Sequence, residues 1–174
     1  MADEENRQQL AKWQLRQKVN ILIDQASGIL EFGSNHSILG LAQSVYVVEP
    51  RNPSLRIQVL RGVNTIGFTA IDHQASVLPG TSDSSLGYDA FIGELWAYGK
   101  CEYRGPSCQY GDIIELGIKF PLNFVNEGNC SVKLYLSIND RLITEKVIAM
   151  PTFAIYPTIS MWHNAKVKYF KMIR

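Results

Sequence analysis

Strict alternation of apolar and polar residues in two stretches constrains the fold of this chain more than any other feature. Residues 114–120 carry Ile, Leu, Ile and Phe at every second position, and residues 132–138 repeat the pattern with Val, Leu, Leu and Ile. Successive side chains of a β-strand point to opposite faces, so each stretch predicts a strand that is buried on one face only. Such strands are typical of antiparallel sheets. The pattern therefore predicts an all-β protein.

Five short motifs follow one another between Ser85 and Phe170. They are Gly87-Tyr88-Asp89, an aromatic strand that ends at Gly99-Lys100, Gly111-Asp112-Ile113-Ile114, a strand that runs into Asn139, and Tyr156-Pro157-Thr158-Ile159-Ser160. In this order and spacing they resemble the SPRY domain family, and the resemblance is clear from Leu55 onward and looser from Val19. It implies a twisted two-sheet antiparallel β-sandwich of the SPRY or concanavalin-like jelly-roll type.

The length of 174 residues predicts one domain with a core of its own. We expect residues 1–16 to form a short N-terminal helix, because acidic residues precede basic ones in the order that suits the helix dipole. Too few apolar positions recur there for a docking seam, which favours a helix packed on the domain, and docking to a partner is the alternative. Residues 17–174 are expected to form the β-sandwich.

Shorter patterns predict the strands and loops of the rest of the chain. The predicted strands of the N-terminal half lie at residues 19–23, 29–32, 44–48, 55–60 and 64–72. The predicted long loops lie at residues 74–85, 100–110 and 121–129.

Charged residues are balanced and scattered along the chain. Seventeen basic and sixteen acidic residues give a net charge of +1 without a run of either sign, so we expect no nucleic acid partner and no membrane partner. No apolar run approaches the roughly 18 to 20 residues of a membrane helix. The cysteines are three, an odd number, and the N-terminus is polar rather than signal-like, which predicts a cytoplasmic protein.

Motifs of catalysis and of cofactor binding do not occur in the sequence. His36, His73 and His163 are far apart and lack the short spacings of metal ligands. Adjacent Asp72 and His73 would point to opposite faces of a strand, so they cannot serve one Ser-His-Asp triad. The Glu-x-Asp-x-x-Glu strand of jelly-roll glucanases is also missing. We therefore expect no enzymatic activity, no cofactor and no metal.

The resemblance to SPRY domains also implies where a partner would bind. Members of that family hold peptides or proteins on loops at one end of the sandwich, and loops on a rigid scaffold suit this work. By resemblance, the contact residues come from three segments, residues 37–40, 77–80 and 161–163. The residues that we expect to contact a partner are Leu39, Gly40, Leu78, Pro79, Met161, Trp162 and His163.

Trp162 is the first candidate, because aromatic residues dominate binding hot spots, and a Trp packed into the edge of the sandwich is an equal alternative. Several peptide-binding SPRY domains carry Arg where this chain has Leu39, before Gly40. A guanidinium can bind an acidic or amide group through two hydrogen bonds. Leu39 cannot, so a ligand of that chemistry is not expected.

These expectations combine into one hypothesis of function. We expect a non-catalytic adaptor that binds a peptide or a partner surface through the loop end of the sandwich and is a monomer on its own. A glycan-binding lectin of similar architecture is an alternative, with Asp112 and Asn139 as candidate sugar ligands. A structural subunit of a larger complex is another. A contiguous apolar patch on a sheet face would favour the subunit, and a concave pocket floored by Trp162 would favour the adaptor.

Overall fold

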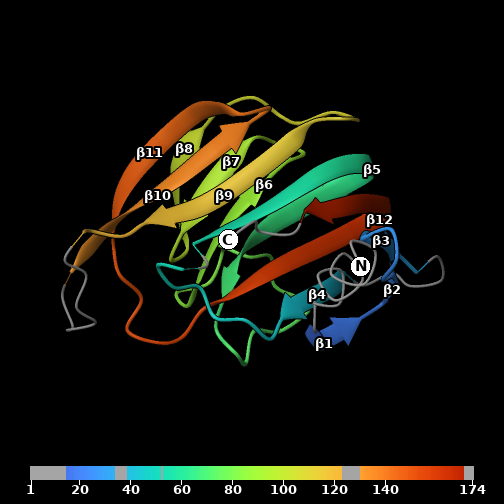
Figure 1. The fold of residues 1–174 in the computed structure, drawn as a ribbon, viewed down its shortest axis with the longest axis horizontal. Coiled ribbons are helices and arrows are strands. Elements are labelled where there is room, and N and C mark those ends of the chain that lie inside the picture. The colour runs from blue at the N-terminus through green and yellow to red at the C-terminus, as the bar shows by residue number, and fades with distance from the viewer. Residues whose placement is uncertain (1–14, 34–38, 52, 123–129, 171–174) are drawn as a thin grey trace, which may run out of the picture.

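The computed structural model describes residues 15–33, 39–51, 53–122 and 130–170, and these residues form an all-β fold (Figure 1). None of them belongs to a helix that could cross a membrane. The described part of the chain contains twelve strands. In chain order they are β1 (Leu15–Val19), β2 (Ile21–Asp24), β3 (Ile29–Phe32), β4 (Gly40–Ser44), β5 (Ser54–Thr69), β6 (Ser85–Asp89), β7 (Glu94–Ala97), β8 (Lys100–Arg104), β9 (Ile113–Lys119), β10 (Ser131–Ile138), β11 (Arg141–Ala149) and β12 (Tyr156–Phe170).

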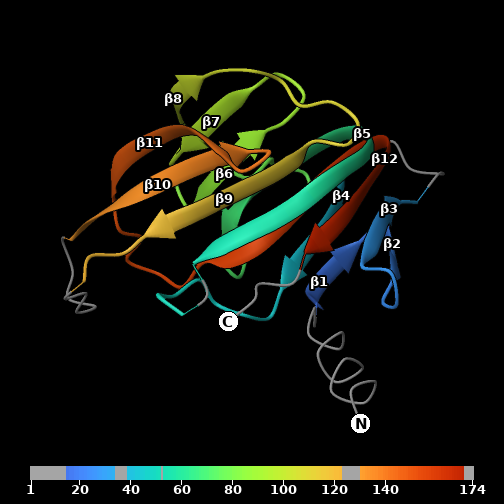
Figure 2. The same ribbon diagram turned by 45° about the horizontal axis from the view of Figure 1, so that its top comes forward.

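The strands form two antiparallel sheets that share the long strands β5 and β12 (Figure 2). Sheet I has the order β1-β4-β12-β5-β6-β7-β8. Sheet II has the order β2-β3-β12-β5-β9-β10-β11. Residues 65–69 of β5 pair with β6 in sheet I, and residues 54–58 of the same strand pair with β9 in sheet II. The two sheets are therefore halves of one hydrogen-bonded surface that folds over on itself.

Both long strands bend where they pass from sheet I to sheet II. The register of their pairing shifts so that residues 163–165 of β12 stand opposite Gly62 of β5 alone. Gly62 and Asn164 have φ angles of 76° and 57°, and the Arg61 Nε donates a hydrogen bond to the Asn164 carbonyl oxygen at 2.7 Å. A bulge of this kind bends a strand and increases its twist, and sandwiches use such bulges at corners where strands change sheets. The bulge therefore makes the corner of this sandwich.

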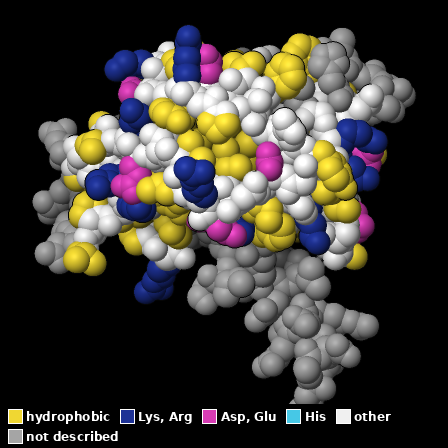
Figure 3. Space-filling view, turned by 90° about the horizontal axis from the view of Figure 1, so that it is seen from above, with side chains coloured by type: hydrophobic (Ala, Val, Ile, Leu, Met, Phe, Trp, Pro, Cys, Tyr) yellow, Lys and Arg dark blue, Asp and Glu magenta, His cyan; other side chains and the backbone are white. Residues whose placement is uncertain are grey.

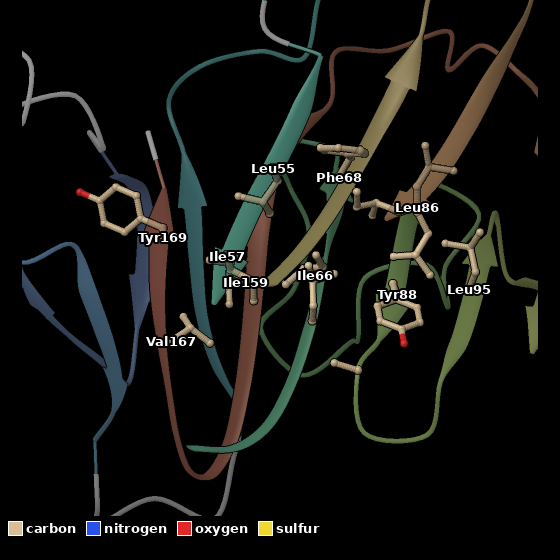
Figure 4. Close-up of a cluster of buried hydrophobic side chains, with 14 of the residues drawn as sticks. Leu55, Ile57, Ile66, Phe68, Leu86, Tyr88, Leu95, Ile159, Val167 and Tyr169 are labelled. Atoms are coloured by element: carbon tan, nitrogen blue, oxygen red, sulfur yellow. The ribbon is translucent and has the colours of Figure 1, made fainter. Parts of the chain in front are cut away.

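Apolar side chains from both sheets meet between the layers and form one core (Figure 4). Sheet I contributes Ile66, Phe68, Leu86, Tyr88, Leu95 and Ile159, and sheet II contributes Leu55, Ile57 and Val167. The apolar residues of the alternating stretches 114–118 and 132–138 are also buried in this core. The one-sided burial that the sequence pattern predicts for β9 and β10 is thus confirmed.

The predicted secondary structure of the N-terminal half is confirmed only in part. Residues 21–24 and 29–32 form the antiparallel pair β2 and β3, close to the prediction. The strand predicted at residues 44–48 is wrong, because β4 ends at Ser44. Residues 55–60 and 64–72 were predicted as separate strands, and most of them belong to the single strand β5, which bends at the bulge instead of ending there.

Two further boundaries differ from the prediction. Residues 1–14 of the predicted helix lie outside the described residues. Leu15 and Arg16, the predicted end of that helix, open strand β1, because backbone pairing with β4 holds this segment extended. Residues 100–104, predicted as part of a loop, form β8 against β7.

Candidate functional site

Period-2 alternation in β12 places Trp162 on the outer face of sheet I. Ile159 and Met161 belong to the core between the sheets, so Ser160 and Trp162 point to the opposite face. The Trp162 side chain is 45% exposed, whereas Met161 is fully buried. Trp162 is therefore accessible to a partner, and Met161, which resemblance also suggested as a contact residue, lies beneath this surface.

Leu39 and Gly40 lie beside this part of β12. Gly40 pairs with Met161 across β4 and β12. A Cβ atom on Gly40 would lie 2.7 Å from the Cδ1 of Ile21 and 2.9 Å from the Cδ2 of Phe32, so glycine lets the neighbouring strands approach closely here. Gly40 is thus a packing position of the core. Leu39 is half-buried and is the member of this predicted pair that is nearer the surface.

The loop between β5 and β6, residues 70–84, crosses the outer face of the same sheet. A Cβ atom on Gly67 would lie 2.6 Å from the Cβ of Pro79, and one on Gly87 would lie 2.1 Å from the Pro79 carbonyl oxygen. Gly67 and Gly87 pair with each other in β5 and β6, so the two glycines together leave room for Pro79. Pro79 is consequently buried against the sheet, and Leu78 beside it is half-buried.

Hydrogen bonds hold this loop in place at both of its ends. The Gly80 N–H donates to the Ser85 Oγ at 2.8 Å, close to the start of β6. At the other end, the Nε2 of His73 lies 2.8 Å from the Val77 carbonyl oxygen. Burial lowers the pKa of His73, so its ring is neutral, and because a carbonyl can only accept, Nε2 carries the donated proton. The loop is therefore ordered before any partner arrives.

Buried polar side chains lie on the same face of the sheet. The Gln43 Nε2 donates to the Thr69 Oγ1 and to the Ala70 carbonyl oxygen, both at 2.8 Å, and the hydroxyls of Thr69 and Thr158 are 2.6 Å apart. The Ser160 Oγ and the Gln43 Oε1 have no hydrogen-bond partner among the described residues. Buried polar atoms are normally paired. Where β4, β12 and β5 lie side by side, this face is therefore neutral, polar and largely withdrawn from water.

The buried polar residues Gln43, Thr69, Thr158 and Ser160 form a strip on this face. Trp162 lies at one end of the strip and Pro79 at the other. Gly67, which lies under Pro79, pairs with Thr158, and Trp162 is four residues farther along β12. At about 3.3 Å per residue, the two ends are about 13 Å apart along the strand. About four residues of an extended peptide cover such a distance.

The predicted contact residues thus separate into three groups. Leu39 and Trp162 lie near one end of the strip, and Leu78 and Pro79 lie near the other. Gly40 and Met161 face the core. The side chain of His163 lies outside the described part of the chain.

Sequence reasoning missed the polar residues between the two ends. Thr158 and Ser160 share a face with Trp162 because they are four and two residues before it in one strand. This alternation within β12 was the available signal. Gln43 gave no such signal, because only the pairing of β4 with β12 brings it opposite Thr158.

Asp112 and Asn139, the candidate sugar ligands of the lectin alternative, hold neighbouring turns together. The Asp112 Oδ2 accepts from the Gln109 N–H at 2.8 Å, and its Oδ1 accepts from the Asn139 Nδ2 at 2.9 Å. The Asn139 Oδ1 accepts from the Ile113 N–H at 2.9 Å. These contacts explain both side chains without a ligand. Among the described residues, no group of three His, Cys, Asp or Glu side chains could hold a metal ion.

Comparison with known proteins identifies the fold. Neither a known family model nor a curated protein matches the sequence. A crystal structure of a human SPRY domain matches with a TM-score of 0.74 and 20% identity, and the match covers 88% of this chain and 96% of that chain. The SPRY domain of human HERC1 matches with a TM-score of 0.63 and 16% identity over 90% of this chain and 96% of its own.

A third solved structure, the PSpry domain of TRIM65, matches with a TM-score of 0.62 and 11% identity over 98% of this chain and 99% of that chain. The three likenesses extend over most of each chain. They show that this chain has the SPRY fold, and they confirm at the level of fold the resemblance that the five sequence motifs indicated.

Proposed function

We propose that this chain is a non-catalytic protein-interaction module that binds a short extended segment of a partner protein on the outer face of sheet I. The segment would contact Trp162 and the half-buried Leu39 and Leu78, and it would not lie on Thr158 and Ser160, which are buried. The observation that carries the proposal is the exposed indole of Trp162 beside a face that is otherwise buried. Tryptophan is enriched among the residues that dominate binding energy. The SPRY fold supports the proposal, because domains of that family are known as protein-binding modules.

The geometry of the strip favours a peptide over a large surface. Its length suits about four extended residues, and the hydrogen-bonded loop needs no ordering when a peptide binds. Leu39 offers an apolar contact next to Trp162 and no charge. An adaptor role, a cytoplasmic location and a monomeric state remain predictions that accompany this proposal.

The proposal is tested first by finding the segment and then by mapping its site. Proteins captured from a soluble cell extract are identified, and overlapping synthetic peptides from them are titrated against the purified protein. Trp162→Ala should weaken the best peptide about thirtyfold, as loss of a hot-spot aromatic does, and Leu78→Asp should weaken it by placing a charge at the other end. Val147→Ala is the matched control, since Val147 is 69% exposed on β11 of sheet II.

Circular dichroism and thermal unfolding establish that each variant is folded. A peptide that binds wild type and Trp162→Ala equally well would place the site elsewhere and overturn the proposal. Equal losses of peptide affinity in Trp162→Ala and Val147→Ala would also overturn the proposal, because the two side chains lie on the outer faces of different sheets.

A further inference from the structure

Exposed apolar side chains occur in several separate places on this molecule. On the face seen from above, apolar patches alternate with Lys, Arg, Asp and Glu side chains (Figure 3). Two neighbours, Phe91 and Ile92, stand out because they occupy the turn between β6 and β7 and are 62% and 52% exposed. Neither residue belongs to the strip between Trp162 and Pro79.

The side chain of Asp89 fixes the shape of this turn. Its Oδ1 accepts hydrogen bonds from the N–H groups of Phe91 and Ile92, at 2.9 and 3.2 Å. The Gly93 N–H donates to the Asp89 carbonyl oxygen at 2.8 Å, and Gly93 has a φ of 76° that favours glycine. The two apolar side chains are therefore held outward by a rigid backbone.

The loop of residues 105–112 lies against the same turn. The Cys108 N–H donates to the Ala90 carbonyl oxygen at 2.7 Å, and the Gly105 N–H donates to the Gly93 carbonyl oxygen at 2.8 Å. A Cβ atom on Gly93 would lie 2.3 Å from the Gly105 carbonyl oxygen, so the two segments are in close contact. The buried Tyr88 fixes the loop from within, because its hydroxyl donates to the Pro106 carbonyl oxygen at 2.6 Å.

This contact brings further exposed apolar groups beside the turn. Pro106 is exposed, and Tyr110, two residues beyond Cys108, is 79% exposed. We call Phe91, Ile92, Pro106 and Tyr110 the tip surface. With aromatic side chains of about 150–250 Å² each, the exposed parts of these four residues add up to roughly 400 Å².

The tip surface presents no unpaired charge. The charged side chains in and directly beside residues 88–93 and 105–112 are those of Asp89, Glu94, Arg104 and Asp112, and the Arg104 Nε lies 3.0 Å from the Glu94 carboxylate. Asp89 accepts the two N–H groups of the turn, and Asp112 accepts from Gln109 and Asn139. A partner would therefore gain from apolar contact and not from charge complementarity.

The available area also limits what the partner can be. A stable interface between two folded proteins buries about 800 Å² on each side, about twice the apolar area of the tip surface. An interface with a second copy of this chain would need about as much area again from residues outside the tip surface. A single peptide segment with two or three aromatic or aliphatic side chains fits the area.

From this preorganised, uncharged and limited surface we propose that the tip surface is a second docking site, for a short uncharged apolar peptide segment of a partner protein. It lies across β5 from Trp162, because Asp89 pairs with Thr65 and Trp162 pairs with Val63. Two strand spacings, about 10 Å, therefore separate β6, which leads into the tip surface, from β12. The inference is independent of the function proposed for the Trp162 site.

The test uses a library of random peptides displayed on phage, selected against the purified protein at high salt, where charge contacts are screened. Enriched peptides are synthesised and titrated against the wild type and the double variant Phe91→Ser/Ile92→Ser. We expect uncharged peptides with at least two aromatic or aliphatic residues, bound about thirtyfold more weakly by the double variant. Their affinity should be the same at low and high salt.

Trp162→Ala separates this site from the other one, and it should leave the affinity of these peptides unchanged. Tyr110→Ala is a second variant at the tip surface, for the case that the double variant does not fold, and it should also weaken binding. Enrichment of no peptide of this class would overturn the proposal. Equal binding by wild type and Phe91→Ser/Ile92→Ser, or loss with Trp162→Ala alone, would overturn it too.

Discussion

The outer face of sheet II carries ion pairs across β9, β10 and β11, whereas residues 70–84 cover the outer face of sheet I at β5 and β6, and the Arg104–Glu94 ion pair of sheet I lies at its β7–β8 edge. In sheet II, Lys119 and Lys133 both contact the carboxylate of Glu145. Arg56 lies between two acids, with its Nη1 3.3 Å from the Glu115 carboxylate and 2.7 Å from that of Asp140. All of these side chains remain partly exposed to solvent. Exposed ion pairs of this kind contribute little to stability.

Across β4, β12 and β5, the outer face of sheet I contains neutral groups that water does not reach. Gln43, Thr69 and Thr158 are fully buried there, and Pro79 lies on the glycines of β5 and β6. An exposed aromatic side chain is therefore exceptional on this face and calls for an explanation. On sheet II, the exposed Val147 lies among solvated charges and calls for none, because single exposed apolar residues are common.

Glycine-to-alanine substitutions should give the largest difference in the free energy of unfolding between the covered face of sheet I and the charged face of sheet II. In Gly87→Ala, the new Cβ would lie 2.1 Å from the carbonyl oxygen and 2.4 Å from the carbonyl carbon of Pro79, and this backbone leaves it no room. We expect a loss of about 3 kcal/mol in the free energy of unfolding, at the upper end of what overpacking costs. Urea denaturation measures it.

Gly117→Ala is the matched change on sheet II. Its Cβ would lie 2.4 Å from the Cζ of Tyr135, but this contact is with a side chain that can rotate toward solvent. We expect a loss of about 1 kcal/mol, because the ring gives way and the backbone does not move. If Gly117→Ala lowers the free energy of unfolding as much as Gly87→Ala does, the loop over sheet I does not make that face less tolerant of an added Cβ.

The sequence predicted the strands of sheet II better than the surface of sheet I, and the reason is physical. In β9 and β10, local alternation alone decides which side chains are buried, so residues 114–120 and 132–138 could be assigned from the sequence. β5 was divided into two strands, because nothing local shows that Gly62 bends a strand without ending it.

The candidate site depends on pairings between distant parts of the chain. Leu39 and Trp162 are close only because β4 pairs with β12, and Pro79 meets the sheet only because Gly67 and Gly87 are neighbours. The resemblance to SPRY domains supplied these residues as candidates. It could not show that Met161 is buried, although the alternation with Ile159 contains that information.

Removing one hydroxyl from each face should give the next largest difference in the free energy of unfolding between the two faces. Thr158→Val removes a fully buried hydroxyl that contacts the Thr69 Oγ1 at 2.6 Å and donates to the Tyr156 carbonyl oxygen at 2.9 Å. We expect a loss of about 2 kcal/mol, since partners that stay buried lose their hydrogen bond. Thermal and urea unfolding at neutral pH measure this change.

Tyr135→Phe is the corresponding change on sheet II. The Tyr135 hydroxyl donates to the Glu115 Oε1 at 2.6 Å, but Glu115 also contacts Arg56 and is partly solvated. We expect a loss of about 1 kcal/mol. A larger loss for Tyr135→Phe than for Thr158→Val would show that the charged face contributes more to stability than the covered one.

The smallest expected difference is in the response of the two faces to acid. Burial lowers the pKa of His73 below its ordinary value of 6.5, so the unfolded chain takes up this proton first. The contribution of His73 to stability is therefore complete above pH 6.5 and declines as the pH falls from there toward the folded pKa. His73→Gln keeps a donor for the Val77 carbonyl oxygen without a titrating ring, and it should remove this part of the slope in urea unfolding.

Glu145 gives sheet II a different range of pH. The hydrogen bond from Lys119, followed by the charge of that lysine and contacts with Lys133, lowers the pKa of Glu145 below its ordinary value of 4.5. Its stabilising contribution is present above pH 4.5 and is lost as the pH falls through the lowered pKa. Glu145→Gln should therefore be less stable than the wild type by a constant amount between pH 6.5 and 4.5, and the two free energies of unfolding should converge in stronger acid, where the wild type loses this contribution. If the stability of His73→Gln changes with pH just below pH 6.5 as steeply as that of the wild type, the neutral His73 ring does not stabilise the loop over sheet I. The two faces then do not differ in their sensitivity to mild acid.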